Sequence, residues 1–437
     1  MRNVFYLENE WLPSFPAHWI MSRLKDHTFT NTGITFTKAD LVEDGNAVLS
    51  YGQVHAKNNP RTEINHELIR FIPNSFITNK ESAKVNKGDF IFADTSEDLE
   101  GCGNCIYIDR DIELYAGYHT TLLRNKSLKC GKYFAYLFMS DQWRSQIRRK
   151  VKSVKLFSVS QGILNQTFII LPPHAEQVAI AAYLDKECEK IGREIELLEQ
   201  KADDYRRLHR SLINRAVISG LNPMVPMRPS GNDWIGDIPK HWNYERVERY
   251  FHSDTEINKD FEFTHAFKFY MGTIVPKNEE LEEEDYREVY VRYTKVKTND
   301  IMINGLNLNY DLKSMRVGIV PYNGIITSAY VALRPFDGVN AQYFNYLFKA
   351  LDYRKFFHGM GKGVRLTLSF NELRTFEIPI PPIYEQREIV AYLDEKCDKI
   401  DSIIEKIEAK IERLKELKRS LINEVVTGQR AINTSEL

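Results

Sequence analysis

Apolar residues recur at alternating steps of four and three residues in two long stretches of the chain. The positions are Leu184, Cys188, Ile191, Ile195, Leu198, Ala202 and Tyr205 in the first stretch, and Leu393, Cys397, Ile400, Ile404, Ile407, Ile411 and Leu414 in the second. This spacing is typical of the seam of a coiled coil. Two prolines precede each stretch, and Gly220 and Gly428 follow them. We therefore expect two helices of about 45 residues, each roughly 65 Å long.

The two stretches are copies of each other. Residues 380–429 align with residues 171–220 without a gap, and 23 of the 50 aligned positions are identical. A shorter repeat relates NEWLPSFPAHW at 9–19 to NDWIGDIPKHW at 232–242. Shared apolar spacing does not explain an identical Pro-Pro, Glu-Gln, Cys and Arg-Ser-Leu-Ile-Asn, so the sequence indicates an internal duplication. We expect the Trp-Pro-His-Trp cluster of the short repeat to anchor each domain on its core.

The charge distribution predicts how the two helices pair. Each begins with acidic residues, such as Glu176 and Glu385, and ends with basic residues, such as Arg210 and Arg419. Antiparallel packing places the acidic half of one helix against the basic half of the other, so we expect an intramolecular antiparallel coiled coil. The alternative is two separate amphipathic helices, each packed on its own domain.

The seam spacing changes near the end of each helix. The strict phase reaches His209 and Lys418, which are polar. We expect Leu208 and Leu417 to replace them in the seam through a three-residue step, which locally overwinds the pair.

The segments between the helices predict a mixed α/β fold. Short strand-like runs lie at 47–54, 90–93, 105–108, 120–123 and 167–171, and a helix is predicted over 132–147. Residues 243–379 repeat this plan loosely, with a turn at 299–301, a helix at 342–348 and a strand at 376–380. The predicted fold class is α+β, with two mixed α/β domains, each followed by a long helix, and an internal pseudo-twofold duplication. The predicted boundaries are 1–170, 171–222, 223–379 and 380–437, with a linker at 222–231.

Composition narrows the class of protein. The chain has 437 residues, 27% of them charged, and a net charge of −1, which suits two or three domains and does not by itself indicate a nucleic-acid partner. We see no signal peptide and no apolar run of the length a membrane span needs, so we expect a cytoplasmic protein without membrane contact. Cys102 and Cys105 form a Cys-x-x-Cys pair, but a matching second pair is missing, so no metal site is predicted.

Basic residues are concentrated in one segment of each domain. Residues 121–160 hold ten Lys and Arg and one acid, whereas residues 341–370 hold five and one. A basic patch in each domain is the electrostatic footprint of phosphate binding, although a single patch also fits an ordinary solvated helix face. The repeat of the patch favours phosphate binding.

Signatures of catalysis are missing from the sequence. It contains no phosphate-binding Gly-x-x-x-x-Gly-Lys-Ser/Thr loop, no Asn/Asp-Pro-Pro-Tyr/Phe tetrapeptide of amino-methyltransferases, no His-Glu-x-x-His and no Gly-x-Ser-x-Gly. We interpret the chain as a non-catalytic binding protein.

Several motifs together resemble the specificity subunit of type I restriction–modification systems. They are the Pro-Pro-x-x-Glu-Gln entry at 172–177 and 381–386, the Ala-Tyr-Leu-Asp stretch at 182–185 and 391–394, and the Ser-Leu-Ile-Asn exit at 211–214 and 420–423. Tyr51-Gly52-Gln53-Val54-His55 is similar to a strand that recognition domains of this family often carry. The resemblance covers essentially the whole chain.

The resemblance implies that each variable domain is a target-recognition domain that reads one half of a bipartite site in double-stranded DNA. It implies that the coiled coil sets the distance between half-sites and docks two modification subunits, which methylate adenine N6, and the restriction subunits. S-adenosylmethionine, ATP and Mg²⁺ would be used by those partners, and no cofactor is expected in this chain.

Polar and basic residues of the loops are the candidate DNA contacts, because base edges carry the sequence information and phosphates position the protein. Candidate base contacts are His55, Lys57, Asn58, Asn59, Arg61, Asn307, Asn309, Lys313 and Arg316. Candidate phosphate contacts are Lys150, Lys152, Lys155, Lys362 and Arg365, and Arg148 and Arg149 are further candidate DNA contacts. Two other classes stay open at this stage: a coiled-coil assembly adaptor that does not bind DNA, and an enzyme of unknown motif.

Overall fold

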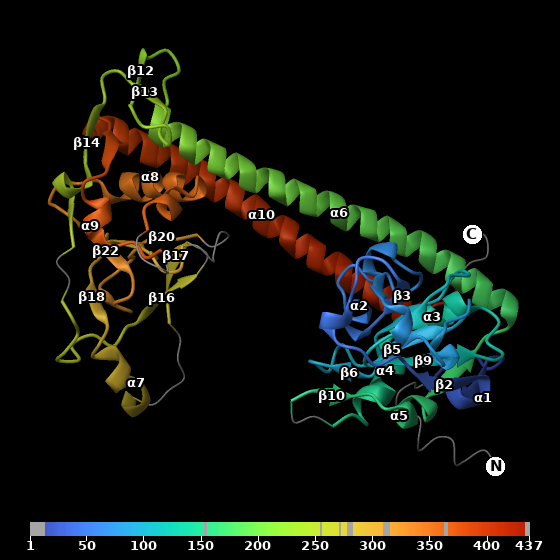
Figure 1. Ribbon diagram of the computed structural model, residues 1–437. Coiled ribbons are helices and arrows are strands. Elements are labelled where there is room, and N and C mark those ends of the chain that lie inside the picture. Colours follow the sequence, from blue (N-terminus) through green and yellow to red (C-terminus); the bar gives the residue numbers. More distant parts are fainter. Residues whose placement is uncertain are drawn as a thin grey trace. The chain divides into compact units, whose positions relative to one another are not determined.

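The computed structural model of the chain describes residues 14–152, 155–253, 256–270, 272–277, 283–308, 315–361 and 366–432. They form two compact units (Figure 1). Unit 1 comprises the described residues up to Leu197 and those from Ala409 on, and unit 2 comprises those of Leu198–Glu408. Both long helices, α6 (His174–Ser219) and α10 (Ile383–Val426), contribute one half to each unit.

Unit 1 is built around a four-stranded antiparallel sheet with the strand order β2-β9-β5-β7. Its strands are β2 (Thr28–Thr32), β9 (Thr120–Asn125), β5 (Phe90–Ala93) and β7 (Cys105–Tyr107). The smaller sheets are β4 (Arg70–Ile72) with β3 (Asn46–Leu49) and β8 (Tyr115–Ala116), β1 (Ile20–Arg23) with β11 (Phe168–Leu171), and β6 (Thr95–Ser96) with β10 (Phe157–Ser158). The helices are α1 (Leu24–His27), α2 (Tyr51–Val54), α3 (Gly131–Met139), α4 (Asp141–Arg148) and α5 (Gln161–Asn165).

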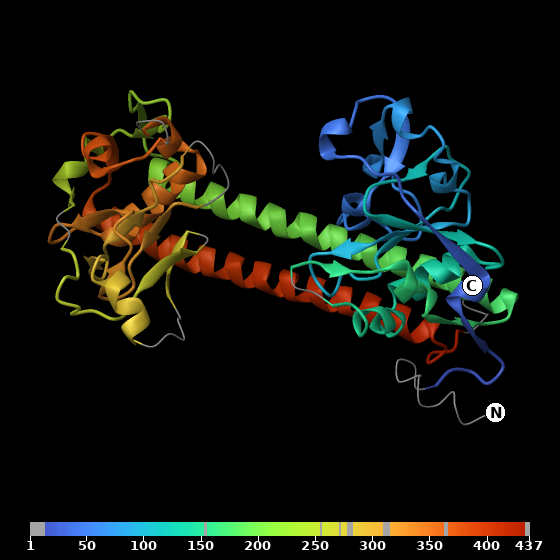
Figure 2. The same cartoon turned by 60° about the horizontal axis from the view of Figure 1, so that its bottom comes forward.

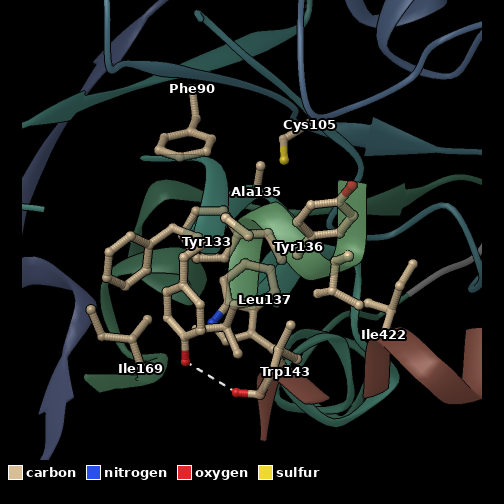
Figure 3. Close-up of a cluster of buried hydrophobic side chains, with 14 of the residues drawn as sticks. Phe90, Cys105, Tyr133, Ala135, Tyr136, Leu137, Trp143, Ile169 and Ile422 are labelled. Atoms are coloured by element: carbon tan, nitrogen blue, oxygen red, sulfur yellow. Dashed lines mark hydrogen bonds between the residues drawn. The ribbon is translucent and has the colours of Figure 1, made fainter. Parts of the chain in front are cut away.

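The central sheet of unit 1 has a hydrophobic core on each face. A single strand contributes to both cores, because successive strand residues point to opposite sides of the sheet. Phe90 and Phe92 of β5 pack in one core with α3, while Ile91 and Ala93 pack in a second core with α2. The first core also contains Ile422 of α10 (Figure 3). The end of the second long helix thus completes the core of the first domain.

Unit 2 repeats this plan with a four-stranded sheet of order β15-β22-β19-β20. Its strands are β15 (Phe251–His252), β22 (Val331–Pro335), β19 (Ile301–Ile303) and β20 (Val317–Ile319). The two-stranded sheets are β12 (Met227–Pro229) with β13 (Asp237–Pro239), β14 (Asn243–Arg246) with β23 (Glu377–Ile380), β16 (Phe267–Tyr270) with β17 (Thr273–Pro276), and β18 (Thr294–Val296) with β21 (Gly324–Ile326). The helices are α7 (Glu283–Tyr290), α8 (Ala341–Tyr353) and α9 (Phe370–Leu373). The core of α8 and β19 contains Ile213 and Val217 of α6.

Within each unit the halves of the two long helices run antiparallel, and both views show them side by side (Figures 1 and 2). In unit 1, Leu184 and Cys188 of α6 share a core with Leu421 and Val425 near the end of α10. In unit 2, Ile213 near the end of α6 shares a core with residues near the start of α10. The ion pair Glu194–Lys410 in unit 1 joins the acidic half of α6 to the basic half of α10. In unit 2, Arg206 of the basic half of α6 pairs with Glu408 near the middle of α10.

The helix limits agree with those predicted from the sequence. Each helix begins directly after a Pro-Pro pair, and Gly220 and Gly428 follow with backbone φ angles of 75° and 73°. Glycine adopts this left-handed conformation without the cost that a Cβ adds, which is why it commonly ends a helix. The predicted fold class, two mixed α/β domains each followed by a long helix, is confirmed.

Two predicted elements were wrong, and serine is the reason in both. The strand expected over 47–54 ends at Leu49, because Ser50 and Gln53 form a capping box that starts α2. The single helix expected over 132–147 is divided at Ser140, whose extended backbone ends α3 and whose Oγ accepts a hydrogen bond from the backbone N–H of Trp143.

The predicted change of seam phase was also wrong. Leu208 and Leu417 are 46% and 51% exposed, and the half-buried positions are His209 and Lys418. The strict spacing therefore continues, and the seam accepts polar side chains: His209 Nε2 lies 3.8 Å from a carboxylate oxygen of Asp401. The linker expected at 222–231 contains β12, which pairs with β13.

Candidate nucleic-acid interface

The motifs shared by the two units are structural contacts. In unit 1, Trp19 Nε1 donates to Oε2 of Glu176 over 2.8 Å, and His18 Nε2 lies 2.8 Å from the other carboxylate oxygen. Glu176 belongs to the Pro-Pro-x-x-Glu-Gln entry of α6, so the short repeat holds the first turn of the helix that follows the domain.

Unit 2 contains the same arrangement. Trp242 Nε1 donates to Oε2 of Glu385 over 2.8 Å, and His241 Nε2 lies 2.6 Å from Oε1. Burial raises the pKa of the Glu385 carboxyl, but the hydrogen bonds from Trp242 and His241 outweigh it and lower this pKa below its usual value. The glutamine that follows each of these glutamates also makes an equivalent hydrogen bond. The side-chain amides of Gln177 and Gln386 each donate to the carbonyl of the first proline in their Pro-Pro pair.

A buried tyrosine in each unit joins the end of one long helix to the strand that precedes the other, β11 in unit 1 and β23 in unit 2. Tyr133 Oη donates to the carbonyl oxygens of Val426 (3.0 Å) and Ile170 (3.3 Å), and Figure 3 shows its place in the first core. Tyr343 Oη makes the equivalent bonds to Val217 (3.1 Å) and Pro379 (3.3 Å). These contacts account for the helix motifs without assigning them any contact to DNA.

Unit 1 contains a cleft of about 910 Å³. It lies between α2, the loop that follows β6, α4 and the last turns of α10. Its lining residues are Tyr51, Gly52, His55, Arg61, Thr95, Ser96, Glu97, Asp98, Glu100, Gly101, Asn104, Tyr118, His119, Met139, Asp141, Arg144, Arg148, Leu156, Lys415, Lys418, Arg419 and Ile422.

Ion pairs neutralise part of the charge in the cleft. Arg148 lies 3.2 Å from Glu100 and 3.2 Å from Asp141, and Asp141 also accepts hydrogen bonds from Arg419 and Asn423. Although partial burial raises the pKa of Asp141, the hydrogen bonds from Arg419 and Asn423 lower it to about 2. Arg144 is 4% exposed, and burial lowers the pKa of its guanidinium to about 9.

The basic residues of 121–160 divide into internal and exposed groups. Arg124 pairs with Asp89, Lys132 with Asp185, and Arg148 with the acids named above. The exposed residues that follow α4 are Arg149, Lys150, Lys152 and Lys155, of which Lys150 donates to the side chain of Gln166. We call these four residues the basic segment. The structure thus leaves only part of the charge in 121–160 on the surface.

The predicted base contacts of unit 1 are placed in different surroundings. Lys57 and Asn58 are exposed. His55 lines the cleft, but its ring nitrogens contact the Thr95 carbonyl (2.8 Å) and the Asn104 amide (3.0 Å). Arg61 lines the cleft as well. Asn59 is buried and donates to the carbonyl of Val54, so it supports the loop and is not available to a base.

In unit 2, Asn307 is exposed, whereas Arg316 is 1% exposed. Arg316 Nη1 donates to the carbonyls of Asn304 and Leu306, so its position contradicts a base contact. Its charge made it a candidate, but the sequence does not reveal that a loop of carbonyls surrounds it. Asn309, Lys313, Lys362 and Arg365 lie outside the described residues.

The predicted seam residues are found on the packed sides of the helices. Those that are buried are Leu184, Cys188, Ile191, Leu393, Cys397, Ile400 and Ile407, and those that are half-buried are Ile195, Leu198 and Ile404.

Sequence reasoning did not select Tyr118, His119, Lys415 or Lys418 as site residues, although all four line the cleft. No sequence signal joins them, because they come from distant segments that meet only in the folded unit.

Cys102 and Cys105 are buried free thiols, and burial raises the pKa of Cys105 to about 12. In the described part of the chain, no helix is both long and apolar enough for a membrane crossing.

Comparison with known proteins relates both repeats to one family. The sequence model of the type I restriction modification DNA specificity domain matches residues 16–201 and 266–413. A curated relative from Methanocaldococcus jannaschii, the type I restriction enzyme MjaX specificity subunit, is 22% identical over 367 residues, which are 79% of each chain.

A solved structure is similar in fold. A chain from a study of complex assembly and conformational transition of the type I R-M system has a TM-score of 0.68 at 17% identity, covering 95% of this chain and all of that one. The HsdS subunit of Thermoanaerobacter tengcongensis has a TM-score of 0.48 at 16% identity, over 95% of this chain and 98% of that one.

Proposed function

The chain belongs to the type I restriction modification DNA specificity family, and from this premise we propose that its two units each read one half of a bipartite DNA site. The observation that carries the proposal is the duplication. The two central sheets have the same strand order, while the loops and smaller sheets around them differ. Like scaffolds with unlike loops suit two different half-site sequences, because base edges carry the information.

The exposed polar residues of the loops are the candidate base contacts within the described residues. They are Lys57 and Asn58 in unit 1 and Asn307 in unit 2. The basic segment after α4 is the candidate phosphate contact, since its four cations are exposed on one short stretch.

We assign to the two long helices the roles of setting the half-site distance and docking partner subunits. The repeat supports docking of two identical modification subunits, because the two helices expose an apolar side chain at an equivalent position. Leu208 in unit 2 and Leu417 in unit 1 are equivalent, and both are exposed leucines. The restriction subunits would join this assembly.

Catalysis in this proposal belongs to the partners. The modification subunits would use S-adenosylmethionine, and the restriction subunits would use ATP and Mg²⁺. Assaying the chain alone for methyl transfer and for DNA cleavage tests this division, and activity in either assay would contradict it.

The basic segment provides a direct test of DNA binding. Replacing Lys150, Lys152 and Lys155 by glutamine should weaken binding to all duplexes alike, and should reduce the slope of log affinity against log salt by about 2 to 3. Fluorescence anisotropy over a salt series, with the modification subunit present, measures both quantities.

The matched control replaces three exposed lysines elsewhere in unit 1, Lys25, Lys38 and Lys80, by glutamine. Unchanged affinity in the first variant would remove the basic segment from the interface. If the unmodified protein binds no duplex at all, the coiled-coil adaptor becomes the better description.

A further inference from the structure

One side of the cleft in unit 1 is aromatic. Tyr51 of α2 lies with its ring centroid 6.2 Å from that of Tyr118 and 5.7 Å from that of His119, and Tyr118 and His119 are 4.0 Å apart. Tyr51 is 39% exposed as a residue, and the His119 side chain is 40% exposed. A Cβ built on the neighbouring Gly52 would lie more than 4 Å from every residue outside this part of α2, so the surface of α2 is uncovered at that position. An exposed ring in an open cleft is a surface on which a base can stack.

The lining of the cleft also carries unneutralised positive charge. Arg61, Arg144 and Lys418 all line it, and within the described ranges none of the three has a carboxylate at ion-pair distance. Burial lowers the pKa of both Arg61 and Arg144, because a desolvated guanidinium lacks a compensating anion. The remaining acids of the lining are Glu97 and Asp98, and Asp98 accepts a hydrogen bond from the Gly101 backbone.

Two residues of the cleft have strained backbones. Arg61 and His119 have φ angles of 68° and 53°. These lie in the left-handed region, which is unfavourable for a residue that has a side chain. Among the described residues of unit 1, Asn79 is the only other non-glycine with a positive φ. The strain therefore coincides with one cationic and one aromatic member of the cleft.

The second unit uses the equivalent helix positions differently. Lys418 and Arg419 correspond to His209 and Arg210 in the repeat. His209 approaches Asp401 at 3.8 Å, and the Arg210 guanidinium lies 5.6 Å from the ring centroid of Tyr353. Unit 2 forms the same scaffold although His209 and Arg210 both contact other side chains. The scaffold therefore does not require free cations at these two helix positions.

We propose that the cleft of unit 1 binds a single nucleotide, with the base against Tyr51 and His119 and the phosphate against Arg61 and Lys418. Aromatic rings and unpaired cations are the two groups that together recognise a base and its phosphate. The cleft, at about 910 Å³, is of the size that encloses a small organic ligand. The nucleotide is either free in solution or turned out of bound DNA. The DNA source rests on the proposed function, whereas the site itself does not.

Calorimetric titration of the full chain with dAMP, deoxyadenosine and inorganic phosphate tests the site. The dAMP should bind at least about tenfold more tightly than either fragment, because only dAMP has both a base for the aromatic rings and a phosphate for the cations. Tyr51→Leu and Arg61→Gln should each lower dAMP affinity about tenfold. Phe29→Leu and Lys25→Gln are the matched controls, since both residues are exposed in unit 1 and outside the cleft, and they should leave the affinity unchanged.

The second arm separates the two sources of the nucleotide. The same variants are titrated, without partner subunits, with a series of duplexes. Each duplex carries 2-aminopurine at one position of the recognised site. If dAMP does not bind but Tyr51→Leu abolishes a fluorescence change at one position, the nucleotide comes from DNA. If phosphate binds as tightly as dAMP and Tyr51→Leu has no effect, or if neither arm responds, the proposal is wrong. Failure to bind any duplex, both alone and with the modification subunit present, would instead contradict the proposed function, and the dAMP titration would still test the site.

Discussion

At the scale of single residues, the shared motifs act through hydrogen bonds to carboxylates and carbonyls. Trp19 and Trp242 donate to Glu176 and Glu385, at equivalent places in the two units. Each indole therefore joins the start of its domain to the first turn of the helix that follows it. Hydrogen bonds to a charged acceptor contribute more than neutral ones, so these contacts should matter for stability.

Replacing Trp242 by phenylalanine should lower the free energy of unfolding by about 1–3 kcal/mol. The ring stays apolar, but the Glu385 carboxylate loses its indole donor in a place where Trp242 is only 2% exposed. Urea denaturation followed by circular dichroism measures the change. Trp234→Phe is the control, because Trp234 is 45% exposed and should have little effect. Equal effects of the two substitutions would show that the hydrogen bond is unimportant.

Asp141 predicts a dependence of stability on pH. Its folded pKa of about 2 lies below the ordinary value of 3.8, because hydrogen bonds from Arg419 and Asn423 outweigh the effect of burial. A lowered folded pKa adds stability that is complete above about pH 4 and is lost as the pH falls toward 2. Asp141→Asn should therefore be less stable at pH 7 by on the order of 1 kcal/mol, since water screens a partly exposed carboxylate.

The stability of this variant and the unmodified chain should converge near pH 2, and urea denaturation at several pH values measures this. Asp111→Asn, at an exposed position of the same unit, is the control. A constant difference between the two curves over the acidic range would contradict the assignment.

At the scale of elements, apolar spacing predicted the long helices and their ends, but polar seam residues were misjudged. We expected leucine to displace His209 and Lys418, yet Leu208 and Leu417 are exposed. A seam near a helix end accepts a polar side chain when that side chain directs its polar end to water or to a partner. His209 does this toward Asp401. The four-and-three spacing thus holds to the helix ends, whereas the polarity of a single residue does not show whether that residue lies in the seam.

The seam assignment can be tested with a matched pair of substitutions in α6. Leu184→Ala should destabilise unit 1 by about 2–5 kcal/mol, because the side chain is fully buried in a core shared by α3 and α10. Leu197→Ala should change stability by less than about 0.5 kcal/mol, because Leu197 is 65% exposed. Thermal and urea denaturation of the full chain measure both, and similar losses for the two would refute the assignment.

At the scale of the whole molecule, the duplication produces two units that each combine one domain with halves of both long helices. The core of unit 1 contains residues of α3 together with Ile422 and Val425 of α10. A recognition domain is therefore not separable at the end of its own sequence repeat, since its core includes a helix end encoded far along the chain.

Exchanging residues 20–170 for the domain of another family member should change only one half of the methylated site. The exchange should succeed when the residues that contact α10, among them Tyr133 and Asp141, are kept, because Tyr133 binds the Val426 carbonyl and Asp141 binds Arg419. Mapping methylated adenines with partner subunits present measures the outcome. A change in both halves would contradict reading by separate domains.

The sequence by itself determined the features that depend on local periodicity and on repetition. These are the limits of α6 and α10, the duplication, the family and the strands β5, β7 and β9 of the central sheet of unit 1, because apolar spacing and turn residues act over a few neighbours. It also placed the Trp-Pro-His-Trp cluster as an anchor, without showing that Glu176 and Glu385 are the groups it holds.

Only the tertiary structure decided which charged residues are available to a ligand. Arg316 and Arg144 are buried, whereas Lys152 and Lys155 are exposed, and nothing in their local sequence separates the two pairs. The cleft of unit 1 was likewise invisible in the sequence, because Tyr51, His119 and Lys418 meet only after the sheet and the end of α10 pack together. Burial and charge pairing depend on contacts between distant segments, which local patterns do not encode.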